Sequence, residues 1–248
     1  MAKTDAIFRL AGFLAISLAW AALAPSAHAC LREIPLEAQL VADARAQPLQ
    51  GFAGNGKIPP FLLGHLSYLR EAAQSGDGEG VHGAVLFVQQ GGAWRAFLPA
   101  DGESTLSAYV SSSSPLVIIV THLQIEGPGQ SFTVMRSTDG LRSAQCAILP
   151  FPKALNRGGW KSEYLELRSL QLDARGKGRL IASALLGADT DRQQTRWWRY
   201  RTRNGAKSWS RPRALPGARA PRPGVLIPIP ETASPAQLES LASYANGR

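Results

Sequence analysis

Residues 202–212 constrain the fold of this chain more than any other part of the sequence. They include Asn204-Gly205, a pair that readily adopts the positive φ angles of a tight β-hairpin turn. Thr202 and Ser208 flank the pair, so their hydroxyl groups can bond to the backbone of the turn. Trp209 follows on the returning segment, where an aromatic ring can enter the space between two sheets. This stretch therefore predicts a β-hairpin within a β-rich fold.

Similar hairpins recur along the chain, and each ends in a Leu-Pro pair. The pairs close at Pro99, Pro150 and Pro216, which are 51 and 66 residues apart. A period of this size suits a unit of four antiparallel strands. The first of the three hairpins keeps only a Gly-Gly turn and Trp94. The spacing therefore predicts repeated four-stranded units.

The two later hairpins, near 135–146 and 200–212, resemble the Asp-box hairpin of sialidases and related β-propellers. The pattern is Ser/Thr-x-Asp/Asn-Gly-x-x-Ser/Thr-Trp-Ser-x-Pro, with Ala144 at the Trp position of the earlier hairpin. The matching residues are Ser137, Asp139, Gly140, Thr202, Asn204, Gly205, Ser208 and Trp209. The resemblance lies within 83–216 and implies a structural element without catalytic groups.

From Val81 onward, short apolar or alternating runs are bounded by Gly, Asp, Asn and Ser, which is typical of antiparallel strands. We expect strands at Ala84–Val88, Leu116–Val120, Phe132–Arg136, Leu165–Leu172, Leu180–Leu186 and Thr195–Thr202. The fold class predicted is all-β, a propeller-like array of three to four antiparallel four-stranded blades with short N- and C-terminal helices. An incomplete propeller and a repeat-bearing sandwich are the alternatives.

The segments near the two ends complete this interpretation. Ile34–Gln47 predicts a helix with Pro35 in its first turn. Ser234 with Gln237 predicts a capping box that opens a C-terminal helix. Val225–Ile229 is a candidate strand to close a ring beside an N-terminal strand. Phe61–Arg70 fits either a short helix or a strand.

Residues 1–29 have the features of a secretory signal peptide. A basic start is followed by an uncharged stretch from Leu10 to Ala24, then by Pro25 and the small-x-small pattern Ala27-His28-Ala29. About 15 apolar residues are too few for a membrane span, which needs roughly 20. We therefore expect an exported protein, periplasmic or secreted, with residues 30–248 forming a single domain.

Cys30 and Cys146 are the two cysteines of the chain. Cysteines of an exported protein are commonly paired, so we expect a Cys30–Cys146 disulfide. Cleavage after Ala29 would also place Cys30 first in the mature chain, where a lipid anchor is an alternative. His28 fits poorly at the middle position of the preceding lipobox. Two free thiols are the remaining alternative.

The chain is strongly basic. Removal of Lys3, Asp5 and Arg9 with the leader lowers the 27 basic and 18 acidic residues to 25 and 17, a net charge of +8. A basic exported protein suits an acidic glycan, an anionic lipid surface or an acidic envelope protein as partner. Nucleic acid is not an expected partner, because the leader directs the chain out of the cell.

The positive charge is concentrated late in the chain, where ten basic residues and no acidic one lie between Arg192 and Arg222. Side chains alternate along a strand. One face of 195–203 would therefore hold the candidate binding residues Trp197, Arg199, Arg201 and Arg203. The other face would be core. Arginine favours bidentate capture of carboxylate, sulfate or phosphate. The alternative is a solvated outer strand that keeps a sheet edge soluble.

Catalytic and metal-binding patterns are weak in this sequence. Glycoside hydrolysis usually needs two paired carboxylates. The candidate acids are Asp101, Glu103, Glu126, Glu163 and Glu166, and nothing in the sequence pairs any two of them. His65, His82 and His122 lack metal-ligand spacing. We therefore expect a non-catalytic envelope binding protein without cofactor or metal. The alternatives are an unusual sialidase-like glycoside hydrolase and a scaffold subunit.

Overall fold

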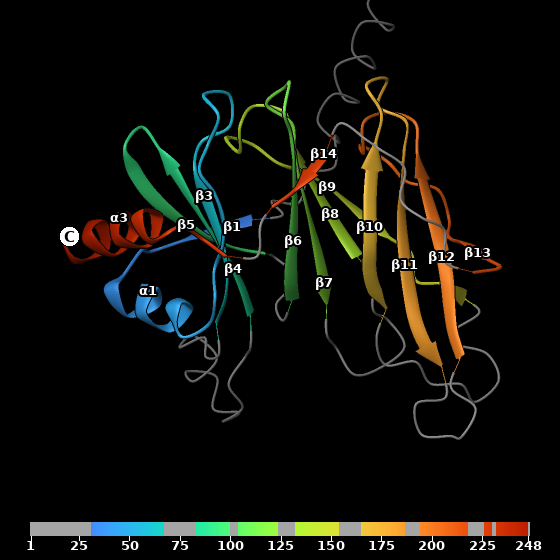
Figure 1. Cartoon of the computed structure of the whole chain (residues 1–248), viewed down its shortest axis with the longest axis horizontal. Coiled ribbons are helices and arrows are strands. Elements are labelled where there is room, and N and C mark those ends of the chain that lie inside the picture. Colours follow the sequence, from blue (N-terminus) through green and yellow to red (C-terminus); the bar gives the residue numbers. More distant parts are fainter. Residues whose placement is uncertain are drawn as a thin grey trace, which may run out of the picture.

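The described residues of the protein form a stack of three antiparallel β-sheets with two helices at one end (Figure 1). The computed structural model describes residues 31–66, 83–99, 104–123, 132–153, 165–186, 194–217, 226–229 and 232–247. Each sheet contacts the next through apolar side chains, so the core is divided into layers. Among these residues no helix has the length and apolar character needed to cross a membrane.

The first sheet has five strands in the order β1-β5-β4-β3-β2. They are β1 Leu31–Ile34, β2 Gln50–Phe52, β3 Phe61–Leu66, β4 Gly83–Gln90 and β5 Ala93–Pro99. Helices α1 (Ala38–Arg45) and α3 (Pro235–Asn246) cover its outer face (Figure 1). Val41 and Leu241 of the helices pack there with Leu62 and Phe87 of the sheet.

The second sheet, with the order β14-β6-β7-β8-β9, is buried on both faces. Its strands are β6 Ser104–Ser111, β7 Val117–Leu123, β8 Phe132–Ser137, β9 Gln145–Leu149 and β14 Leu226–Pro228. In β7, Val117 and Ile119 pack toward the first sheet, whereas Ile118 and Val120 pack toward the third. Burial of both faces explains why β7 begins with an unbroken apolar run.

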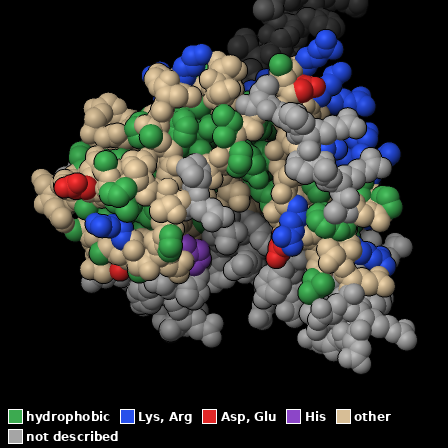
Figure 2. Space-filling model, in the orientation of Figure 1, with side chains coloured by type: hydrophobic (Ala, Val, Ile, Leu, Met, Phe, Trp, Pro, Cys, Tyr) green, Lys and Arg blue, Asp and Glu red, His purple; other side chains and the backbone are tan. Residues whose placement is uncertain are grey.

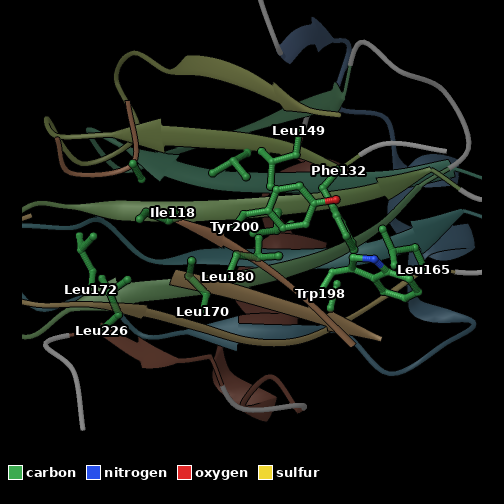
Figure 3. Packing of buried hydrophobic residues seen from close by; sticks show 14 of the residues in the cluster. Ile118, Phe132, Leu149, Leu165, Leu170, Leu172, Leu180, Trp198, Tyr200 and Leu226 are labelled. Atoms are coloured by element: carbon green, nitrogen blue, oxygen red, sulfur yellow. The ribbon is translucent and has the colours of Figure 1, made fainter. Parts of the chain in front are cut away.

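The third sheet has four strands in the order β10-β11-β12-β13. They are β10 Glu166–Leu172, β11 Gly178–Leu186, β12 Gln194–Thr202 and β13 Arg213–Leu215. Trp198 and Tyr200 of β12 point into the core between the second and third sheets (Figure 3). The hydroxyl of Tyr200 donates to the carbonyl of Pro150 at 2.9 Å, and its ring meets that of Phe132 edge-on. No described helix or strand packs on the opposite face of this sheet.

The C-terminal segment returns from the third sheet to the other two. β14 pairs with β6, and the next residue, Ile229, donates its N–H to the carbonyl of Ala108 at 3.0 Å. The N–H of Ala233 then donates to the carbonyl of Leu49, the residue before β2 of the first sheet, at 2.6 Å. The described residues 226–229 and 232–247 therefore connect the second sheet to the first.

The structure confirms a mostly β fold with two short helices, and it corrects several details. The first and second sheets have five strands each, not four. The described strands form three separate sheets and close no ring, because α1 and α3 occupy the face on which a last sheet would have to pack. The strand expected at Val225–Ile229 pairs with β6, not with an N-terminal strand.

One further correction and one assignment that the sequence left open concern the N-terminal part. The helix expected from Ile34 begins at Ala38, and Ile34 itself ends β1. In β1, Glu33 forms an ion pair with Arg95 of β5, which favours the extended pairing over an earlier helix start. The ambiguous Phe61–Arg70 contains strand β3, which ends at Leu66. Its later residues lie outside the described part of the chain.

Candidate functional site

The candidate site lies on the outer face of the third sheet, and β12 positions its residues. Trp198, Tyr200 and Thr202 are 2%, 0% and 3% exposed and face the core. Between them, Arg199 is half-buried and Arg201 is exposed, both on the outer face. The predicted alternation of β12 is therefore confirmed. It follows from the strand's period of two and from the apolar cover on one face alone.

Four arginines surround a shallow depression of about 410 Å³ on this face. We call it the arginine groove. It is lined by Arg199, Arg201, Arg203, Asn204, Ser208, Trp209, Ser210 and Arg213. No acidic side chain is among these described lining residues. Three of the predicted binding residues are thus brought together. The fourth, Trp197, is half-buried on the same face beside Leu215 but does not line the groove.

Arg213 is a groove residue that the sequence pattern did not predict. It lies on β13, and the register places it directly opposite Arg199. That register depends on how many residues the intervening hairpin consumes, and this number is not evident from an alternation pattern. On the other side of β12, Arg179 pairs with Arg201, and its Nε donates to Gln171 at 2.8 Å. The outer face is therefore cationic across three neighbouring strands.

The hairpin at the end of β12 holds one end of the groove. The N–H of Ala206 donates to the Thr202 hydroxyl at 3.1 Å, and the N–H of Ser208 donates to Asn204 Oδ1 at 3.1 Å. Gly205 and Ala206 both have φ of 68°. Side chains therefore replace the backbone pairing in this turn, as the flanking hydroxyl and amide predict.

The hairpin between β8 and β9 has the same arrangement. The N–H of Leu141 donates to the Ser137 hydroxyl at 2.8 Å, and the N–H of Ser143 donates to Asp139 Oδ1 at 3.0 Å. Gly140 and Leu141 have φ of 70° and 67°. The two hairpins thus share their hydrogen bonds and backbone conformation, one residue for one residue, on neighbouring sheets.

The hairpin between β4 and β5 differs from these two. Gly91 and Gly92, with φ of 58° and 83°, form a two-residue turn between the paired Gln90 and Ala93. Trp94 is 1% exposed and packs toward the helices, where its Nε1 donates to Ser240 at 3.1 Å. The first repeat therefore keeps the turn without the side-chain bonds, and its tryptophan does not lie between sheets.

Trp209 is half-buried rather than largely buried as expected from the sequence. One part of the side chain packs against the core between the second and third sheets, and another part lines the groove. Its Nε1 is buried and has no hydrogen-bond partner among the described residues. The position places an aromatic surface beside the arginines.

Two hairpin groups have shifted pKa values. Burial acts to raise the pKa of Asp139, but hydrogen bonds from Ser143, Ser137 and the Arg142 N–H outweigh it and lower the pKa. Burial lowers the pKa of Arg136, whose Nε donates to the carbonyl of Gly205. Arg136 of the second sheet thereby contacts the turn of the third.

A second depression, of about 530 Å³, lies between the first and second sheets. It is lined by the loop 53–60 together with Gln89, Gln90 and the Asp139 turn. Lys57, one of its two cations, donates to the carbonyl of Ser113 at 2.7 Å. An acidic side chain and a lysine already bound to the protein make this depression a weaker anion site than the arginine groove.

The other sequence candidates are scattered. Glu166 forms an ion pair with its neighbour Arg168 on β10, and the remaining candidate acids lie outside the described residues. His65 is on β3 and His122 on β7, whereas His82 is not described. The described part of the chain contains no group of three or more His, Cys, Asp or Glu side chains able to hold a metal ion.

Cys146 lies half-buried on β9 and is not a free thiol. Cys30 lies outside the described residues, so its pairing with Cys146 stays a prediction. Leu31, the next residue after Cys30, packs against the same apolar cluster as Cys146. This shared cluster brings the start of β1 toward β9. The signal peptide predicted for 1–29 also lies outside the described residues.

Comparisons with protein-family models, with curated protein sequences and with solved structures found no match to this chain. The site therefore has to be interpreted from its own geometry and charge.

Proposed function

We propose that this chain is an exported, non-catalytic binding protein of the cell envelope that captures an acidic ligand in the arginine groove. The single observation that carries the proposal is the convergence of Arg199, Arg201, Arg203 and Arg213 on a depression whose described lining residues include no acidic side chain. Guanidinium groups form paired, charge-assisted hydrogen bonds with carboxylate, sulfate and phosphate. A face evolved only for solubility would more commonly mix both signs of charge.

We infer that the three sheets are blade-like units related to the Asp-box folds. Support comes from the two hairpins at Ser137–Ser143 and Thr202–Ser208, which repeat the same side-chain to backbone bonds on adjacent sheets. The face-to-face stacking of the sheets also fits blades. Such folds serve several unrelated activities, so the function rests on the groove rather than on this relationship.

A binding experiment with matched charge changes tests the function. The mature protein is titrated with a sulfated polysaccharide, a polyuronate and neutral dextran, at low and at high salt. Arg201→Ala/Arg203→Ala removes two exposed groove charges, and Arg45→Ala/Lys153→Ala removes two exposed charges elsewhere. Loss of charge-assisted bonds should weaken acidic-polymer binding at least about tenfold in the first double variant.

The control double variant should bind nearly as the parent does, and salt should weaken binding steeply. Equal losses of affinity in both double variants would mean that the groove contributes only through the net charge of the protein. Release of new reducing ends from the glycans would replace the proposal with the hydrolase alternative. Binding that depends on neither variant nor salt would favour the scaffold alternative.

A further inference from the structure

Two turns of the third sheet meet at one end of the arginine groove. The N–H of Gly205 in the β12 hairpin donates to the carbonyl of Gly176 in the β10–β11 turn at 2.8 Å. Four cations belong to these turns or bind them, and we call them the rim cluster. Arg175 and Lys177 flank Gly176 in the chain, Lys207 lies two residues after Gly205, and Arg136 Nε donates to the Gly205 carbonyl. The rim cluster therefore lies on two turns that a backbone hydrogen bond joins, together with Arg136 of the neighbouring sheet.

The groove and the rim cluster share the β12 hairpin. Arg203, Asn204 and Ser208 line the groove and belong to the same hairpin as Lys207. Figure 2 shows Lys and Arg side chains gathered over the end of the molecule that the third sheet forms. The acidic residue in these two turns is Asp173, whose Oδ1 accepts the N–H groups of Arg175 and Lys177 at 2.9 and 2.8 Å.

Asn204 adds no negative charge to the hairpin that the groove and the rim cluster share. The corresponding residue of the second-sheet hairpin is Asp139, which accepts the same backbone bonds. The amide of Asn204 donates to Ser208 at 2.9 Å, whereas in the other hairpin Ser143 donates to the Asp139 carboxylate. Either residue therefore completes the turn, and the choice changes charge rather than conformation.

We propose that the ligand of the groove is a linear acidic polysaccharide that lies along β12 and continues across the Asn204 turn onto the rim cluster. The proposal rests on the function proposed above. Alternate residues of a strand are about 6.7 Å apart, which separates Arg199 from Arg201 on β12, and Arg203 extends this row beyond the end of the strand into the turn. One small anion is satisfied by one or two guanidinium groups. A row of three arginines instead matches repeated charges on one polymer.

The aromatic residues favour a polysaccharide among polyanions. Trp209 lines the groove, and Trp197 lies on the same face in the row of arginines. Tryptophan offers a flat apolar surface beside polar groups, which suits a sugar ring carrying sulfate or carboxylate. A membrane surface would be met by protruding turns alone, without use of a recessed row on a sheet face.

The first test is chain length. Sulfated oligosaccharides from disaccharide to dodecasaccharide are titrated into the mature protein at low salt. Affinity per molecule should rise with length until the oligomer covers both groove and rim cluster. Arg175→Ala/Lys177→Ala should weaken the longest oligomer about tenfold and leave the tetrasaccharide nearly unchanged, because only the longer ligand reaches the rim cluster.

The second test uses the two hairpins as matched partners. Asn204→Asp adds a carboxylate beside the arginines, and should weaken long oligomers about three- to tenfold at low salt. Asp139→Asn makes the reverse change in the equivalent turn, away from the groove, and should leave affinity within about twofold. Thermal unfolding of both variants confirms that each turn still forms.

The outcomes separate the two proposals. One outcome is binding that is equally tight for the shortest and longest oligomers and insensitive to Arg175→Ala/Lys177→Ala. This result overturns the proposal that a polysaccharide extends from the groove onto the rim cluster, but it leaves the groove as a site for an acidic ligand. Failure of every oligomer to bind removes the proposed function itself. Tighter binding to anionic vesicles, or to single-stranded oligonucleotides, than to any oligosaccharide would assign the same cations to a membrane or to nucleic acid.

Discussion

The outer faces of the first and third sheets, at the two ends of the stack, differ in what covers them. The outer face of the first sheet is apolar and is covered by α1 and α3. The outer face of the third sheet carries a row of arginines and has no described helix or strand upon it. A covered face adds to the core, whereas a charged face that contacts water adds little to stability. One end of the molecule therefore adds to folding, and the other is the end for which we propose binding.

The largest effect should come from the link between the first and second sheets. If Cys30 and Cys146 are paired, removing the bond by Cys146→Ala should cost about 4–5 kcal/mol in the chain-entropy model, because the closed loop is long. Urea unfolding with and without reductant measures the loss. Two alkylatable thiols in the unreduced mature protein would contradict the pairing.

The two tryptophans compare the ends of the stack directly. Trp94→Ala, in the fully buried layer beneath the helices, should cost about 3–5 kcal/mol. Trp209→Ala should cost less, about 1–2 kcal/mol, because the side chain is only half-buried and lines the groove. Thermal or urea unfolding gives both values. An equal or larger loss for Trp209→Ala would mean that the groove edge is part of the core.

The covering helix can be weakened without touching the core. Ser234 accepts the Gln237 N–H at 3.3 Å in a capping box at the start of α3. Ser234→Ala should therefore cost about 1 kcal/mol. Ser243→Ala, an exposed position later in the same helix, is the control and should change stability little. If both variants unfold as the parent does, α3 adds less to the first sheet than its burial suggests.

The smallest effect on stability should come from the arginine row. Arg201→Ala/Arg203→Ala removes exposed side chains, so the free energy of unfolding should change by no more than about 0.5 kcal/mol. The same protein should lose most of its affinity for acidic polymer. A stability loss comparable to that of Trp94→Ala would show that the arginines stabilise the third sheet. The outer faces of the first and third sheets would then not differ in their contribution to stability.

The exposed face of β12 was predictable from sequence, because alternation along 195–203 predicts one core face and one outer face, and β12 has both. The strand expected at Leu116–Val120 is present as β7, but its burial on both faces was not predicted. Strand β6 was missed because Ser104–Ser111 contains three serines and little apolar pattern, although Leu106, Ala108 and Val110 alternate toward the first sheet.

Non-local pairing could not be predicted in the same way. The sequence placed Arg199, Arg201 and Arg203 on one face, but Arg213 joined them only through the β12–β13 register. The prediction that β14 lies beside an N-terminal strand is wrong, because three residues carry no signal for the strand with which they pair. Local alternation thus predicts faces, whereas the assembly of a site from two strands depends on loop lengths and three-dimensional packing.

The return of residues 226–247 to the earlier sheets has a consequence for how the chain is assembled. Gly51 of the first sheet packs so closely on Ala233 that an added Cβ would lie 2.7 Å from its Cα, and the Gln237 amide donates to the carbonyl of Phe52 at 2.9 Å. During synthesis, the outer face of the first sheet therefore cannot be fully covered until α3, the last helix, has been made. We expect the nascent chain to remain open on that side until nearly all of it has been made, which would suit the export that we propose.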